Sequence, residues 1–103
     1  MTDRLSQLRK LYDIDPNDPF ITYGIALEHA NQGEVDEALR WLDQTLQIDA
    51  QYCYAYFQKG RLLSDAGRDD EAKAALREGV KQAEQAGDAH AASEIGELLA
   101  SLE

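Results

Sequence analysis

The sequence predicts an all-α protein built from repeated helix pairs, and two observations support this prediction. The segment GEVDEALRWL at Gly33–Leu42 recurs as GRDDEAKAAL at Gly67–Leu76, 34 residues later. A fixed period of this size is typical of stacked helical or β units. The segments on both sides of each copy carry apolar residues at helical spacing and no strand pattern. We therefore expect a superhelix of about six antiparallel helices.

Each copy of the repeated segment predicts a junction between two helices. Gly33 and Gly67 can adopt the left-handed conformation that ends a helix. Two acidic residues follow each glycine in the first turn of the next helix, where carboxylates complement the helix dipole. Ala38 and Leu42 share one face of that helix, and the small alanine lets the preceding helix approach closely. Each copy is therefore a helix, a tight turn and a second, antiparallel helix.

The first element is a half-repeat helix within residues 3–14, with the helix expected from about Asp3 to Tyr12. Leu5, Leu8 and Ile14 precede Leu39, Leu42 and Ile48 by 34 residues, so this element reads as the second half of a repeat. Pro16 cannot continue a helix. Asp18 is a suitable N-cap, and Pro19 suits the first helical position.

The later helices follow the same register. They are expected at about Pro19–Gln32, Val35–Ile48, Tyr52–Ala66, Asp69–Ala86 and Ala89–Leu102. The whole chain, residues 1–103, is then one domain with repeat 1 at 19–50, repeat 2 at 53–86 and a C-terminal capping helix at 89–102. Terminal helices of repeat arrays commonly cap an open apolar end.

These residues resemble the tetratricopeptide repeat family, as found in small bacterial proteins. The family pattern has a small residue in the first helix, a turn glycine, an alanine early in the second helix, a large apolar residue one turn later and a proline near the repeat end. The matching residues are Ala26, Gly33, Ala38 and Leu42, then Gly60, Gly67, Ala72 and Leu76, with Pro16 closing the half-repeat. This sequence differs from the family pattern at two positions. Ala50 stands where proline is expected, and Thr22 stands where an aromatic residue is expected.

The resemblance implies a protein–protein interaction module, an adaptor or scaffold without catalytic activity. In this family the first helices of successive pairs line a concave groove that takes an extended or helical peptide of a partner. The residues at those positions are Phe20, Tyr23, Gly24, Leu27 and Asn31 from the helix at 19–32, and Tyr54, Phe57, Gln58, Arg61 and Asp65 from the helix at 52–66. Aromatic residues and arginine are common interface hot spots.

Other uses of this aromatic face stay open. It could be the interface of a self-associating homo-oligomer such as a homodimer, or the helix at 89–102 could cover it. The protein could also be an accessory or regulatory subunit of one dedicated partner. Trp41 has Ala75 as its repeat mate and so lies outside the repeat core. It is either a second contact point or a residue that packs against an adjacent helix.

Charge limits the classes of partner. The chain has 10 basic and 20 acidic residues, for a formal net charge of −10. This balance argues against nucleic acid and against anionic membrane surfaces, both of which attract cationic proteins. A basic protein partner fits such a surface. The alternative is a solvated acidic surface with no binding role.

The remaining features point to a cytoplasmic protein without cofactors. Cys53 is the one cysteine, so no internal disulfide forms, as in a reducing compartment. No apolar run reaches the length of a membrane span, and the N-terminal residues lack the apolar region of a secretory signal. His29 and His90 have no acidic or cysteine partners at ligand spacing, so we expect no metal site, and His29 is expected to be a hydrogen-bonded core residue.

Overall fold

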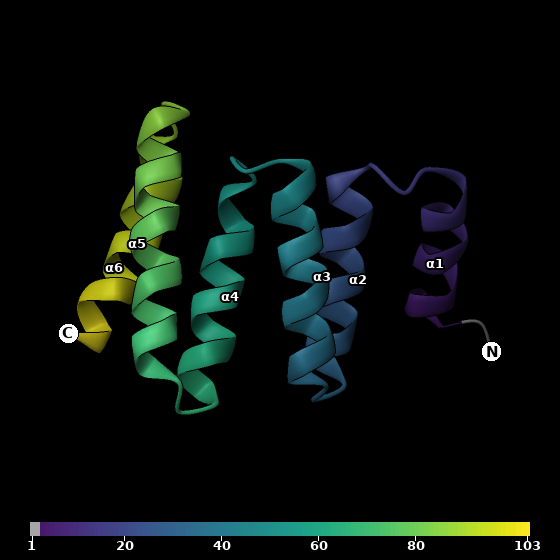
Figure 1. The fold of residues 1–103 in the computed structure, drawn as a ribbon, viewed down its shortest axis with the longest axis horizontal. Helices are drawn as coiled ribbons and strands as arrows, with labels where there is room; N and C mark the ends of the chain where they lie inside the picture. Colours follow the sequence, from purple (N-terminus) through teal and green to yellow (C-terminus); the bar gives the residue numbers. More distant parts are fainter. Residues whose placement is uncertain (1–2) are drawn as a thin grey trace. The chain divides into compact units, whose positions relative to one another are not determined.

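The computed structural model describes residues 3–103, and this part of the chain is all-α (Figure 1). Its helices are α1 (Arg4–Ile14), α2 (Pro19–Asn31), α3 (Val35–Ile48), α4 (Cys53–Asp65), α5 (Asp69–Gln85) and α6 (Ala89–Leu102). The predicted fold class and the order of six helices are confirmed. Helix α1 ends at Ile14, two residues beyond the expected end, because the first residue forced out of helical geometry is Asp15, which directly precedes Pro16.

Three turns between helices contain a glycine in the left-handed conformation. Gly33, Gly67 and Gly87 have φ angles of +77°, +78° and +72°. In each turn the residue after the glycine donates its backbone N–H to a carbonyl five residues earlier, as from Glu34 to His29 at 2.9 Å. This is the Schellman arrangement, which satisfies carbonyl groups at the end of a helix. The left-handed role predicted for the first two of these glycines is confirmed.

The described residues form two compact units, one ending at Asp49 and the other beginning at Ala50. The first unit contains α1, α2 and α3. Its core includes the cluster of Leu8, Ile21 and Ile25, with Leu5, Tyr12 and Trp41 packed against it. Helices α2 and α3 also share a buried hydrogen bond of 2.8 Å between the hydroxyl groups of Thr22 and Thr45.

The second unit contains α4, α5 and α6, and α6 packs against both other helices. Its core contains Cys53, Leu76, Ala83, Ala91 and Ile95. Glycines allow two very close contacts in this unit. A Cβ atom added at Gly60 would lie 2.3 Å from Leu76 Cδ2, and one at Gly79 would lie 2.5 Å from Tyr56 Cβ.

Side-chain caps begin three of the helices. Asp3, Asp18 and Asp88 accept hydrogen bonds from the backbone N–H groups of Ser6, Phe20 and Ala91, respectively. These bonds satisfy N–H groups that have no partner inside the helix. The N-cap predicted at Asp18, with Pro19 in the first turn of α2, is confirmed.

Candidate partner-binding site

The predicted binding residues of α2 lie along the face opposite to its buried side. Phe20, Tyr23, Leu27 and Asn31 are spaced by three or four residues, which places them on one side of a helix. The side chain of Phe20 is exposed, with a relative accessibility of 64 %, and Asn31 is also exposed. Tyr23 and Leu27 are half-buried. We call these four residues the α2 strip.

Gly24 does not belong to this strip. It is buried, and a Cβ atom added there would lie 3.3 Å from both methyl carbons of Leu8 on α1. The glycine is therefore a close-packing position between α1 and α2, so its expected place in the groove lining is wrong.

The first residue of the strip is held by the start of the helix. Asp18 Oδ1 accepts a hydrogen bond of 2.9 Å from the backbone N–H of Phe20. Pro19 occupies the first helical position, where its fixed φ angle suits the helix. The backbone that carries the exposed ring is therefore well defined before any partner binds, which lowers the entropy lost on binding.

The equivalent residues of α4 have different surroundings. Tyr54 and Phe57 are half-buried and pack against the core cluster to which α6 contributes Ala91 and Ile95. The cluster also contains residues of α4 and α5, namely Cys53, Leu76 and Ala83. The two rings of α4 contribute to the core of their unit as well as to its surface.

The polar end of the α4 face consists of Gln58 and Arg61. The guanidinium group of Arg61 donates two hydrogen bonds to Gln58 Oε1, with Nη2 at 2.7 Å and Nε at 3.2 Å. Arg61 is exposed and Gln58 is half-buried. Asp65 is exposed at the last position of the helix. The structure therefore brings together the four α2 residues in the first unit, and the four α4 residues Tyr54, Phe57, Gln58 and Arg61 in the second.

Trp41 packs against an adjacent helix. Its ring lies edge-on to that of Tyr12, with the centroids 5.0 Å apart and an interplanar angle of 88°. The guanidinium carbon of Arg9 lies 5.9 Å from the Trp41 ring centroid, within the range of a cation–π interaction. The tryptophan thus contacts α1, and its half-exposed ring lines a shallow hollow with Tyr12, Arg40 and Gln44.

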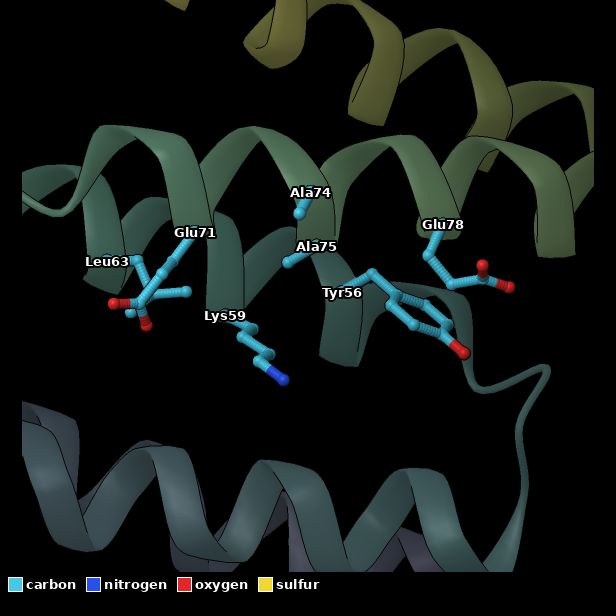
Figure 2. A pocket seen from close by; sticks show the side chains of 7 residues that line it. All are labelled: Tyr56, Lys59, Leu63, Glu71, Ala74, Ala75 and Glu78. Atoms are coloured by element: carbon cyan, nitrogen blue, oxygen red, sulfur yellow. The ribbon is translucent and has the colours of Figure 1, made fainter.

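A hollow on the second unit was not predicted from the sequence (Figure 2). It is lined by Tyr56, Lys59 and Leu63 from α4 and by Glu71, Ala74, Ala75 and Glu78 from α5. Figure 2 shows that Ala74 and Ala75 present only methyl groups where the flanking residues carry long side chains. The signal was present in the sequence, because these alanines stand 34 residues after Arg40 and Trp41. Replacing two bulky residues by alanine leaves space on the surface of the helix pair.

The titratable residues that the sequence singled out have structural roles. His29 is buried, and its Nδ1 lies 2.9 Å from Glu34 Oε1 while its Nε2 lies 3.4 Å from Arg9 Nη2. This confirms the prediction of a hydrogen-bonded core histidine. Cys53 is buried, and its thiol donates a hydrogen bond of 3.3 Å to the backbone oxygen of Gln51. Within residues 3–103, no group of three or more histidine, cysteine or acidic residues is placed to hold a metal ion.

Two carboxyl groups have shifted titration. The hydrogen bonds from Ser6 lower the pKa of Asp3 below its ordinary value. The hydrogen bond from Arg68 lowers the pKa of Glu71. Both groups are on the surface and belong to helix starts, so the shifts reflect capping and a local ion pair. A separate finding is that none of the described helices combines the length and apolar character needed to cross a membrane.

Comparison with known proteins identifies the repeat. Residues 54–86 match the family described as Tetratricopeptide repeat. The chain is similar to a tetratricopeptide repeat domain protein from Salinibacter ruber, whose solution structure has 28% sequence identity and a TM-score of 0.81 over 86% of this chain and 90% of that one. A crystal structure of a tetratricopeptide repeat domain protein from the same organism gives 26% identity and a TM-score of 0.76, over 82% and 94% of the two chains.

A more distant structure has the same fold. The type III secretion chaperone SycD of Yersinia enterocolitica, in complex with a peptide of the translocator YopD, is 16% identical, with a TM-score of 0.84 over 95% of this chain and 76% of that chain. No curated protein matches the sequence. The structural matches confirm the helical-repeat architecture that the 34-residue period predicts.

Proposed function

We propose that this chain, which is a tetratricopeptide repeat protein, is an adaptor that binds a peptide or helix of a partner protein. The proposed binding residues are those of the α2 strip in the first unit and those of α4 in the second. The α2 strip supplies the apolar contact, and Gln58 and Arg61 of α4 supply polar contacts.

The observation that carries this proposal is the exposure of Phe20. A phenylalanine with 64 % accessibility beside a half-buried tyrosine and leucine is an apolar surface that costs free energy in water. Exposed contiguous apolar surface commonly marks an interaction site. The strip is also rigid at its start, because Asp18 and Pro19 fix the first turn. A partner that covers Phe20 therefore gains apolar burial at small conformational cost.

The charge of the chain indicates the kind of partner. The net charge of −10 favours encounter with a basic segment, and the association rate should fall as salt concentration rises. Arg61 adds one cation beside the aromatic residues, so a partner with an acidic or amide side chain at one end suits this surface. We place this interaction in the cytoplasm, consistent with a single buried cysteine.

The likeness to SycD supports the proposal at the level of the fold. That chaperone was solved with a peptide of its translocator bound. At 16% identity the comparison shows that this helical-repeat architecture accommodates a peptide in another protein. The residues that would bind a peptide in this chain are inferred from its own surface.

The test is capture of a partner from an extract of the source cell by the immobilised protein, followed by titration calorimetry with the captured protein. Phe20→Ala should weaken binding at least tenfold, as expected for a central apolar anchor. Gln47→Ala, on an exposed position of α3, is the matched control and should bind as the wild type does. If Phe20→Ala binds as tightly as the control, the α2 strip is not the binding surface.

A further inference from the structure

Helix α1 presents a face that is covered in the equivalent helix of the next repeat. The 34-residue period pairs Leu11 with Thr45 and Ile14 with Ile48. Thr45 is fully buried on α3, where its hydroxyl contacts Thr22 of α2. Leu11 is 48 % exposed and Ile14 is 81 % exposed. The outer face of α1 is therefore an apolar surface. In a complete pair, the first helix, such as α2, covers the equivalent surface of the second helix.

Helix α6 presents the complementary face. It packs in the second unit through Ala91 and Ile95, which are fully buried and spaced like Ile21 and Ile25 of α2. In α2 the residues following these two, Thr22 and Ala26, are buried as well, and Thr22 is bonded to α3. The corresponding residues of α6 are Ala92 and Gly96, and both are only half-buried. Helix α6 thus resembles the first helix of a pair, and within residues 3–103 no second helix covers this face as α3 covers it in α2.

Gly96 shows this vacancy most clearly. At the matching small residue of α4, a Cβ atom added to Gly60 would lie 2.3 Å from Leu76 of α5. At Gly96, apart from the adjoining residues and backbone of its own helix, no described atom lies within 4 Å of such a Cβ. The space beside the small residue, which we call the notch, is thus filled by Leu76 in the α4–α5 pair and is open at Gly96 of α6.

A hollow continues this face at the start of α6. It is lined by the small residues Gly87, Ala89 and Ala92 and by the carboxylates of Glu84 and Asp88. In the α2–α3 pair, Thr45 lies opposite Thr22, so Leu11 of a docked α1 would lie opposite Ala92. Ile14, one turn further along α1, would then reach the hollow.

The two faces also carry opposite charges. Helix α1 contains three basic residues, Arg4, Arg9 and Lys10, against one acidic residue, Asp13, and Lys10 is exposed one turn before Ile14. Helix α6 contains no lysine or arginine and includes Glu94 and Glu97. Opposite charges favour this pairing over association of two like helices.

We propose that α1 of one copy docks antiparallel onto α6 of a second copy and completes a helix pair between them. Ile14 enters the hollow at the start of α6, Leu11 covers Ala92, and Lys10 lies near the carboxylates of Glu84 and Asp88. This surface is separate from the α2 strip, so the inference does not rest on peptide binding. Arg4 stands where complete pairs have an alanine, but its Nε lies 3.2 Å from Glu28 Oε1, so its side chain turns toward α2.

This contact is heterologous, because it joins two different faces. Each copy keeps a free α6 after its α1 is used, so growth continues into rings or filaments instead of stopping at a symmetric dimer. A symmetric dimer through the aromatic face would instead stop at two copies.

The test uses two variants, each of which blocks one of the two docking helices, α1 or α6. Ile14→Asp places a carboxylate against the acidic hollow, and Gly96→Lys fills the notch and repels the basic α1. Both positions have room for the new side chain, so the fold should be retained. Ser6→Asp and Ser101→Lys make the same charge changes at other exposed positions of the two helices and serve as controls.

Sedimentation velocity over a wide concentration range gives the decisive readout. The wild type and both controls should form species larger than a dimer as concentration rises. Each blocked variant alone should remain at the monomer mass of 11.5 kDa. An equimolar mixture of the two blocked variants should form a heterodimer and nothing larger, because one intact α6 then meets one intact α1. A wild type that stays monomeric or stops at a dimer, or a mixture that does not associate, overturns the proposal.

Discussion

The two complete helix pairs share a backbone register but fill their contact with different side chains. In α2–α3 the contact has two hydrogen-bonded threonines, Thr22 and Thr45. In α4–α5 the same two positions hold Tyr56 and Gly79, where the ring of one occupies the space left by the other. The two repeats therefore fill the equivalent contact between their helices with different chemistry. A large residue on one helix is matched by a missing side chain on the other.

The first helices of the pairs differ in a second way. Phe20 on α2 is exposed, whereas its repeat mate Tyr54 on α4 is half-buried and packs with the cluster that includes residues of α6. The two positions are equivalent by period, yet one ring is available to a partner and the other helps to hold its unit together. The surroundings of a repeat position, rather than its place in the repeat, decide whether its side chain is exposed or packed on the core.

The largest effect is expected from placing the threonine of the first pair into the second. Gly79→Thr puts a Cβ atom 2.5 Å from Tyr56 Cβ and 3.3 Å from Ile95 Cγ2, and a Cβ atom cannot move without its backbone. Such overpacking should cost at least about 1–3 kcal/mol, measured by urea unfolding. Adding Tyr56→Thr transplants the whole pair but keeps a Cβ atom at position 56, so it should recover little of the loss. A neutral single substitution would show that the two pairs are not packed differently.

The next effect separates the two aromatic faces. Phe57→Ala should lower the free energy of unfolding by about 1–3 kcal/mol, less than a fully buried phenylalanine, because its ring packs on the core but stays partly exposed. Phe20→Ala should change it by less than about 0.5 kcal/mol, as for other surface positions. Thermal and urea unfolding of both variants give the comparison. Equal losses would mean that α2 and α4 do not differ in this respect.

A smaller effect should be the same in both pairs. Gly33 and Gly67 have φ angles of +77° and +78°, with no atom near the site of an added Cβ. Alanine at either position should therefore cost about 1 kcal/mol, through backbone conformation alone. Urea unfolding of Gly33→Ala and Gly67→Ala should give matching losses. A clear difference between them would show that the two turns are not equivalent.

The smallest effect concerns the start of α1. Hydrogen bonds from Ser6 lower the pKa of Asp3 in the folded protein. A lowered folded pKa means that the ionised cap stabilises the helix start above the ordinary aspartate pKa, and that this stabilisation is lost as pH falls through the lowered value. An NMR titration of the Asp3 carboxyl should show a midpoint below that of an unstructured aspartate. A midpoint at the ordinary value would mean that the cap is absent in solution.

Periodicity was sufficient to predict the helices and their turns. Gly33 and Gly67 could be recognised because left-handed geometry strongly favours glycine, and this requirement is local. The face of α2 was also predictable, because the spacing of Phe20, Tyr23 and Leu27 depends only on helix geometry.

The rest depends on contacts between elements that are distant in the sequence. The partial burial of Phe57 arises from a cluster to which α6 contributes, and the burial of Gly24 depends on Leu8 of α1. The pairing of Thr22 with Thr45 is likewise a tertiary contact, since a polar residue at that repeat position gives no local sign of burial. The hollow beside Ala74 and Ala75 required knowing which neighbouring side chains leave their space empty.

The claim that the α2 strip meets the partner is tested most directly by photocrosslinking in the living source cell. A benzophenone amino acid is placed at position 20, at position 57, or at the control position 47, which is exposed on α3. The label at position 20 should crosslink a partner protein strongly, the label at position 57 weakly, and the label at position 47 not at all. Crosslinking of the same partner at position 47 but not at position 20 would contradict the account.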